Sequence, residues 1–171
     1  GPGGFKKQIA GFNAERIGNA ARSLAYGRYC YTLAREYAMT RKQFGRPIGS
    51  NQAIGHMLAD LATEVEAART LTWRAAWLVS QGKDALREIS MAKLLSSETY
   101  VKVANQGMQV FGAFGYNMEY DMQRHYRDAR SSTIAAGTSQ VQRNVIARTT
   151  TYAVFLILMT ALLLGEFILE F

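Results

Sequence analysis

Three long segments of the chain carry apolar residues at alternating spacings of three and four positions, the pattern of one buried helical face. They run from about residue 13 to 40, from 51 to 80 and from 84 to 111. The stripes are Ile17, Ala20, Leu24, Gly27, Tyr31, Ala34 and Ala38, then Ile54, Leu58, Leu61, Val65, Ala68, Thr72, Ala75 and Val79, and finally Ile89, Ala92, Thr99 and Val103. The spacing predicts three long amphipathic helices.

Residues between the stripes are typical of helix ends. Asn13 is a good N-cap for the first helix, and Asp84 is a good cap for the third. A turn is expected over 41–48, and a loop with a short helical turn over 113–130. A fourth helix is expected from about Thr138. Long helices joined by short loops predict an all-α fold, an antiparallel up-down four-helix bundle.

The end of the chain differs from the rest in composition. No charged residue occurs from Thr149 to Gly165, so the chain divides into a bundle domain over 1–148 and an apolar tail over 149–171, expected as an extra apolar C-terminal helix. The run is at the short limit of a membrane span, which usually needs about 20 apolar residues. Three interpretations remain open: a packing or oligomerisation helix, a membrane-associated tail, or an end without evolved function. The start, Gly1-Pro-Gly-Gly-Phe5, is neither a signal nor a transit peptide.

The 171 residues carry a formal charge of +7, which indicates an anionic partner. The basic residues are spread along all the helices rather than gathered in a block, so no nucleic-acid partner is expected and cofactor phosphates fit better. Cys30, the single cysteine, is expected to be a buried bystander. His56 and His125 have no His or Cys at metal-ligand spacing, so no metal site is predicted.

The segment 107–148 has the composition expected of a segment that lines a ligand-binding site. Gly112, Gly115 and Gly137 allow positive φ or close backbone approach. Thr138 and Ser139 can cap a helix whose free N–H groups face an anion. The same segment contains three glutamines that can recognise a heteroaromatic ring or an amide through neutral hydrogen bonds: Gln109, Gln140 and Gln142.

A series of motifs then carries a resemblance to a known family. In order along the chain they are Arg41-x-Gln-Phe-Gly-x-Pro-Ile48 with Gln52, Ala59-Asp-Leu61, Glu66-Ala-Ala-Arg69, Ser90-Met-Ala-Lys93, Gln109-x-Phe-Gly-x-x-Gly-Tyr116, Arg127-Asp-Ala-Arg130 and Gly137-Thr-Ser-Gln140. Together they closely resemble the C-terminal helical domain of acyl-CoA dehydrogenases, over about residues 3–148. Each motif alone is weak, but their order and intervals match.

The resemblance implies a flavoprotein, an oxidoreductase that uses FAD and is usually a homotetramer. In this family a carboxylate base removes the α-proton of an acyl-CoA thioester while a β-hydride passes to FAD. Electron-transfer flavoprotein is the implied electron acceptor. The implied location is the bacterial or archaeal cytoplasm or the mitochondrial matrix, with membrane contact through 149–171 left open.

For the cofactor, Arg41 matches the family arginine that contacts the pyrophosphate of an FAD bound mainly by a neighbouring subunit, a role that suits a guanidinium fork. Phe44 and Gln52 match in register with it. Gln109 and Gly112 match the segment along the adenosine, although Ala113 replaces the family's usual second glycine. Two further residues match positions that contact the flavin: Thr138 and Gln140.

For the substrate, Gly137 would let the thioester approach closely. Many members have Glu-Gly-Thr here, but this chain has Ala136 before Gly137, and a methyl group cannot accept a proton. The isovaleryl and long-chain branches place the base in a Glu-Arg pair near the start of the first bundle helix, which Glu15 and Arg16 match. Glu15 is therefore the expected base, in the first helical turn. Asn13 and Arg16 match a polar pair near the acyl pocket.

The family's N-terminal and middle domains are absent from these residues, so the chain is expected to be a fragment, inactive and unable to bind FAD tightly by itself. Two alternatives stay open: a non-catalytic helical interaction or membrane-associated module, and an acyl-CoA oxidase-like enzyme. Arg127 and Asp128 are expected to form an ion pair that anchors their loop.

Overall fold

The computed structural model describes the backbone of residues 2–151 and the side chains of residues 11–151. Helix α1 (Pro2–Thr40) leads into a hairpin of β1 (Lys42–Gln43) and β2 (Arg46–Pro47) and a 3₁₀ turn, η1 (Ile48–Ser50). Then follow α2 (Gln52–Ser80), α3 (Leu86–Phe111), α4 (Ala113–Tyr116), α5 (Met122–Ser132) and a helix over 139–151. The fold is all-α, as predicted. The expected apolar tail helix lies outside the described residues from 152 on.

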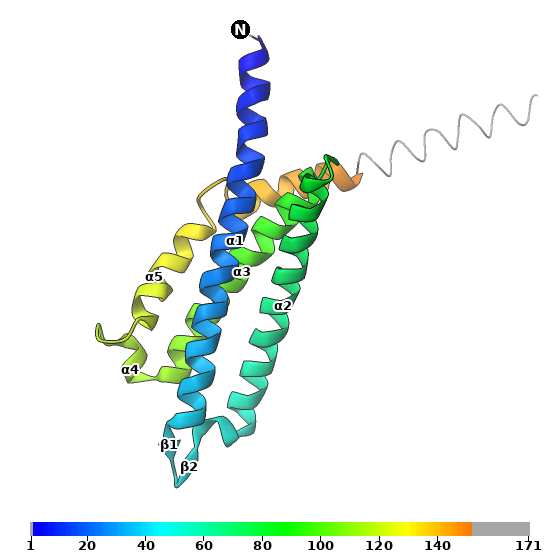
Figure 1. Ribbon diagram of the computed structural model, residues 1–171. Helices are drawn as coiled ribbons and strands as arrows, with labels where there is room; N and C mark the ends of the chain where they lie inside the picture. Colours follow the sequence, from blue (N-terminus) through cyan, green and yellow to red (C-terminus); the bar gives the residue numbers. More distant parts are fainter. Residues whose placement is uncertain (1, 152–171) are drawn as a thin grey trace, which may run out of the picture.

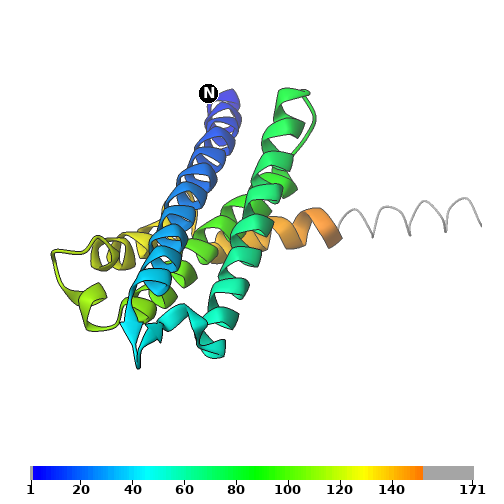
Figure 2. The ribbon, with the colours of Figure 1, turned by 60° about the horizontal axis from the view of Figure 1, so that its bottom comes forward.

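Helices α1, α2, α3 and α5 run alternately in opposite directions (Figure 1). The helix over 139–151 instead runs across the direction of these helices in both views (Figures 1 and 2). The fourth antiparallel element is therefore α5, where the sequence indicated only a short turn. Its 11 residues bury Met122, His125, Ala129 and Ser132. Two of these four are polar, which hides the helical stripe from a hydrophobicity pattern.

Helix α1 begins much earlier than predicted. Its 39 residues start at Pro2, and proline is tolerated in the first turn because the N–H groups there have no intrahelical partner. Asn13 lies in the helix interior and is not an N-cap. Glu15, likewise, is not in the first turn of α1. It therefore cannot stabilise the helix N-terminus through the helix dipole.

The core forms where α1 packs against α3. The stripe predicted for α3 is buried throughout, and Ala20, Gly27, Ala34 and Ala38 are buried on α1. A Cβ on Gly27 would lie 3.4 Å from the Tyr100 Cα, so small residues on α1 set the closeness of the two helices. Cys30 belongs to this core, which confirms its predicted burial, and burial raises the pKa of its thiol to about 12.

The stripe of α2 is confirmed from Leu61 to Ala75, but Val79 is 46% exposed. The spacing after Ala75 is three rather than four, so Leu78 packs against the core in its place. Trp73 and Trp77 are 66% and 53% exposed and are not core residues of this chain. Within residues 2–151, no helix is both long and apolar enough to cross a membrane.

Candidate functional site

The predicted site residues lie at opposite ends of α1. Asn13, Glu15 and Arg16 occupy its first half, whereas Arg41 follows its last residue. The 26 positions from Glu15 to Arg41 correspond to about 39 Å at 1.5 Å per helical residue. The chain therefore does not assemble one site from all of them. It presents two separate groups of residues, one at each end of the bundle.

At the hairpin end, the backbone N–H and the backbone carbonyl of Arg41 both form hydrogen bonds. Its N–H donates to the Tyr37 carbonyl, and its own carbonyl accepts from the Ile48 N–H, each at 2.8 Å. The guanidinium lies over the Phe114 ring, 5.2 Å from the ring centroid. Among the described residues no carboxylate pairs with it. Arg41 is thus oriented, while its N–H donors stay available to an anion.

The tip of the hairpin is strained. Phe44 has φ 52° and Gly45 has φ 82°, two consecutive left-handed residues between the paired Gln43 and Arg46, as in a type I′ turn. A left-handed non-glycine residue costs about 1–2 kcal/mol. The strained backbone holds a fully exposed aromatic side chain, with a relative exposure of 100%. Strain of this kind often marks a binding segment.

The other predicted cofactor residues at this end are exposed. Gln52 is the first residue of α2, and Gln109 lies in the last turn of α3. Neither side chain makes a hydrogen bond with the part of the chain that the structure describes. Gly112 ends α3 with φ 60°, which confirms the positive φ predicted there. Packing of Arg41 on Phe114 brings the hairpin beside this end of α3.

At the other end, residues 136–138 form a strained loop. Ala136 has φ 56° and Gly137 has φ 91°. The Gln142 Nε2 donates to both of their carbonyl oxygens, at 3.2 Å and 3.1 Å. The Lys93 Nζ donates to the Gly137 oxygen at 2.8 Å. Three hydrogen bonds from two buried side chains therefore hold this backbone.

The loop ends in a capped helix. The Thr138 Oγ1 accepts from the Val141 N–H at 3.3 Å, which confirms the predicted cap. The Thr138 carbonyl accepts from the Gln142 N–H at 3.0 Å. Gln140 is exposed. Thr138 and Gln140 thus stand together at a helix N-terminus, where N–H groups favour a negatively charged or electron-rich partner.

Glu15 is exposed, and its carboxylate has no hydrogen-bond or ion-pair partner in the described chain. Its neighbour Arg16 is half-buried and donates from Nη1 to the Asn13 Oδ1 at 3.2 Å. Burial lowers the pKa of Lys93, and the positive charge of Arg16 lowers it further. Ile17, next to Arg16, packs against the hydrophobic cluster that contains Ala92, next to Lys93, and the Lys93 ammonium holds Gly137. Helix α3 therefore contacts both this part of α1 and the loop at 136–138.

Lys93 itself was not predicted as a site residue. It appeared only within the motif Ser90-Met-Ala-Lys93, yet its side chain has a relative exposure of 0%. The signal was present in the sequence, because Lys93 falls on the inward stripe of α3, four positions after Ile89 and seven before Tyr100. A lysine on a buried stripe indicates a specific acceptor.

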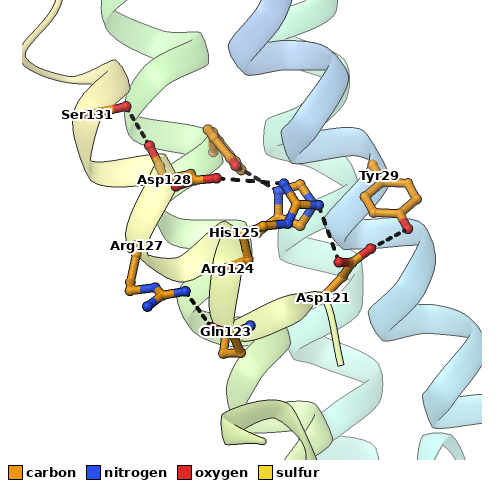
Figure 3. Close-up of polar contacts among 9 residues, drawn as sticks. Tyr29, Asp121, Gln123, Arg124, His125, Arg127, Asp128 and Ser131 are labelled. Atoms are coloured by element: carbon orange, nitrogen blue, oxygen red, sulfur yellow. Dashed lines mark hydrogen bonds and ion pairs between the residues drawn. The ribbon is translucent and has the colours of Figure 1, made fainter. Parts of the chain in front are cut away.

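A second polar cluster joins α5 to α1 (Figure 3). Arg124 pairs with Asp121 at 3.3 Å and with Asp128 at 3.6 Å, and the Tyr29 hydroxyl donates to Asp121 at 3.3 Å. The predicted ion pair of Arg127 with Asp128 is wrong, because adjacent helical residues point in different directions. Arg127 donates to the Gln123 Oε1 instead, at 2.8 Å. No group of His, Cys, Asp and Glu in residues 2–151 is arranged to hold a metal ion.

The fold is that of an all-α domain with a hairpin at one end of the bundle and a capped loop at the other. Residues 2–151 match the family described as acyl-CoA dehydrogenase, C-terminal domain. The chain belongs to the acyl-CoA dehydrogenase family.

Individual relatives agree with this assignment. The chain is 42% identical over 145 residues to an acyl-CoA dehydrogenase of Bacillus subtilis, covering 85% of this chain and 38% of that protein. It is 44% identical over 144 residues to the mitochondrial short-chain specific acyl-CoA dehydrogenase of Bos taurus, covering 84% and 35%. The structure of butyryl-CoA dehydrogenase from Megasphaera elsdenii superposes with a TM-score of 0.85 at 36% identity, covering 86% and 39%. The chain thus spans less than two fifths of these relatives.

Proposed function

We propose that the chain is the C-terminal domain of an FAD-dependent acyl-CoA dehydrogenase, in which Glu15 removes the α-proton of an acyl-CoA thioester. The observation that carries this proposal is that α3 contacts both elements: Ile17 of α1 packs against the cluster that contains Ala92, and Lys93 donates to the Gly137 carbonyl. It puts the helical turn of Glu15 near the loop that would meet the thioester. Ala136, at the position of the family's usual base, offers no proton acceptor.

Each residue at this end has a separate task. The Glu15 carboxylate has no competing partner among the described residues and can accept a proton without first breaking an ion pair. Arg16, oriented by its hydrogen bond to Asn13, supplies positive charge toward the thioester or its CoA portion. Gly137 lets the substrate approach the backbone. The half-buried Arg16 fits the anionic CoA portion of such a ligand, and the unpartnered Glu15 carboxylate is free to accept its α-proton.

FAD is the proposed cofactor, and when bound it supplies the hydride acceptor. The hairpin end fits its pyrophosphate, since Arg41 is oriented with free donors and Lys42 and Arg46 add positive charge without an acidic residue in 41–51. Gln109 and the positive-φ Gly112 would lie along the adenosine. At the other end Thr138 and Gln140 would contact the flavin. A related solved structure is described as PigA with FAD and proline, at 31% identity and a TM-score of 0.80.

The distance between the two ends supports a composite site. About 39 Å of helix separates Glu15 from Arg41, too far for one flavin and its own pyrophosphate. The hairpin of one subunit would therefore contact the FAD whose flavin lies at the 136–138 loop of another. A homo-oligomer follows, for which we propose the homotetramer of the family. For the same reason we expect one isolated chain to bind FAD weakly.

Electron-transfer flavoprotein is the proposed acceptor of the electrons. One relative, 42% identical over 144 residues, is described as a Caffeyl-CoA reductase-Etf complex subunit of Acetobacterium woodii. A similar structure at 38% identity is described as an electron transferring flavoprotein of Acidaminococcus fermentans. Relatives from bacteria and from mitochondria support a location in the bacterial or archaeal cytoplasm or in the mitochondrial matrix.

An oxidase is the second candidate, with oxygen in place of the flavoprotein acceptor. A solved structure described as the prolyl acyl carrier protein oxidase AnaB superposes with a TM-score of 0.78 at 32% identity. Anaerobic reduction of the complete enzyme by acyl-CoA, followed by mixing with oxygen or with electron-transfer flavoprotein, separates the two. Fast reoxidation by oxygen supports the oxidase, and fast reoxidation only by the flavoprotein supports the dehydrogenase.

The base assignment is tested by Glu15→Gln in the complete polypeptide that carries this domain. A general base contributes about 10²–10⁴-fold to the rate, so kcat should fall by a factor in that range with FAD content unchanged. The matched control is Glu36→Gln, an exposed carboxylate elsewhere on α1. Unchanged turnover in Glu15→Gln would contradict the assignment of Glu15 as the base. An equal loss in both variants would point to a general effect on α1.

A further inference from the structure

We propose that Lys93 and Gln142 are positioning residues: together they fix the backbone of residues 136–138 in the conformation that the thioester and flavin meet. The inference rests on the proposed function. Neither side chain faces solvent, since both have a relative exposure of 0%. Both reach the same loop, Lys93 from α3 and Gln142 from the helix over 139–151.

Burial of the Lys93 ammonium has a free-energy cost. Its only hydrogen bond within the described chain goes to a neutral acceptor, the Gly137 carbonyl at 2.8 Å. Among the described residues no carboxylate forms an ion pair with it, and Glu98, whose charge raises the pKa of Lys93, is itself paired with Arg143 at 2.8 Å. Burying an ammonium without a counter-charge is costly, and an apolar side chain of similar volume would fill the space at a lower cost. A buried charge that donates to a single backbone oxygen, at this cost, indicates that the hydrogen bond to that oxygen has a function.

The backbone that it contacts needs holding. Ala136 and Gly137 both have positive φ, at 56° and 91°. Such a conformation persists only where the surroundings enforce it. Gln142 enforces it by donating to both carbonyl oxygens, while Lys93 adds a charge-assisted hydrogen bond to the second. A Cβ at position 137 would lie 2.8 Å from the Gln142 Nε2, so a side chain there would displace the carboxamide.

The contact also polarises a peptide group. The Gly137 carbonyl and the Thr138 N–H belong to the same peptide unit, so positive charge on the oxygen strengthens the N–H as a donor. Within the described residues the Thr138 N–H makes no hydrogen bond. It lies at the capped start of the helix over 139–151, where the free N–H groups already favour negative charge. Lys93 therefore aims and strengthens a donor at the place where charge would develop.

The test uses Lys93→Met and Gln142→Met in the complete flavoenzyme. Methionine approximates the lysine volume, and in Lys93→Met the Gly137 oxygen keeps its bond from Gln142, so the fold should survive. The control is Lys102→Met on the same helix, an exposed lysine that pairs with Glu64. A misplacement of about 1 Å can cost roughly 100-fold in rate, so we expect kcat of the two test variants to fall by roughly 10- to 100-fold. KM and FAD content should change far less.

Two further readouts separate positioning from a structural role. Amide exchange in peptides covering 133–142 should accelerate in Lys93→Met, while peptides of α2 keep their wild-type exchange. The double variant should lose less than the product of the single losses, because both side chains hold one loop. A kcat close to wild type, or unchanged exchange at 133–142, would overturn the inference while leaving the proposed function intact.

The remaining outcomes also decide. A wild-type enzyme with FAD but no acyl-CoA dehydrogenation would remove the proposed function and this inference with it. If Lys93→Met fails to fold, Gln142→Met provides the test by itself. That substitution removes only the two hydrogen bonds that the uncharged Gln142 carboxamide donates to the loop. Wild-type kcat in a folded Gln142→Met variant then counts against the inference.

Discussion

The Tyr100 hydroxyl oxygen lies 2.8 Å from the His125 Nδ1, and both side chains are buried where α3, α5 and α1 meet. The Tyr26 and Tyr29 rings pack on the imidazole, with centroids 5.7 Å and 5.3 Å away. An Nη2 of Arg124 faces its Nε2 at 3.4 Å. The imidazole is thus placed between a phenol and a guanidinium. Burial lowers the pKa of His125, and the positive charge of Arg124 lowers it further.

This arrangement predicts a pH-dependent stability. An unfolded histidine titrates near pH 6.5, whereas the folded His125 stays neutral to lower pH. As the pH falls below about 6.5, the unfolded chain binds a proton that the folded chain does not, so the free energy of unfolding decreases. Asp121 and Asp128 also face the cluster and oppose the shift, but they do not reverse its direction. Denaturant unfolding between about pH 7.5 and 5.5 measures the slope.

Substitutions test whether His125 is the residue that makes the free energy of unfolding depend on pH. His125→Asn should be less stable near neutral pH because the contact with Tyr100 weakens, but its stability should change less with pH over the same range. His56→Asn alters an exposed histidine and should keep the wild-type slope. A wild-type slope in His125→Asn would mean that another group titrates.

A pair of glycines tests the packing at the end of α3. A Cβ on Gly115 would lie 2.8 Å from the Phe111 Cβ and 3.0 Å from the Met108 carbonyl oxygen. These atoms cannot move without shifting the backbone, so Gly115→Ala should lower the free energy of unfolding by about 1–3 kcal/mol. Equilibrium denaturation at constant pH measures the change.

Gly55 is the matched control, because a Cβ there would meet nothing within 4 Å. Gly55→Ala in α2 should raise stability by about 0.5–1 kcal/mol through the helical preference of alanine. Equal effects of the two substitutions would contradict the packing described at Gly115.

Arg41 gives a prediction about cofactor affinity. Hydrogen bonds to charged groups contribute about 1.5–3 kcal/mol, so Arg41→Gln in the complete enzyme should weaken FAD binding by roughly 10- to 150-fold. Flavin absorbance per subunit after gel filtration at falling protein concentration measures the loss. Arg35→Gln, an exposed arginine near the same end of α1, should bind FAD like wild type. Loss of FAD in both variants would argue for a general charge effect.

The long helices could be predicted because their buried faces are apolar at regular spacing. The stripe of α3 is buried at Ile89, Ala92, Thr99 and Val103, as its periodicity requires. Helix α5 was underestimated because two of its buried positions are His125 and Ser132, whose polar atoms are satisfied within the fold. Hydrophobic periodicity cannot detect a face that is buried through hydrogen bonds.

The site was predictable residue by residue but not as an arrangement. Gly112 and Gly137 adopt the positive φ that glycine allows, and Thr138 caps a helix. The helix predicted over 13–40 already separates Glu15 from Arg41, but its periodicity does not show which residues of the other helices lie beside each of them. Lys93 was missed because a charged residue in a helix is usually solvated, and only its place on the inward stripe contradicted that expectation.

Ala136 provides the strongest chemical test of where the base lies. If the thioester meets residues 136–138, a carboxylate at position 136 should be able to replace Glu15. The variant Glu15→Gln/Ala136→Glu should therefore regain part of the turnover that Glu15→Gln loses, with recovery incomplete because the left-handed Ala136 tolerates a larger side chain less well. Glu15→Gln/Ala136→Gln is the matched control, since it has the same volume without a proton acceptor. Equal rates in both double variants would place the thioester elsewhere, whereas recovery in the glutamate variant alone locates the α-proton between α1 and the loop.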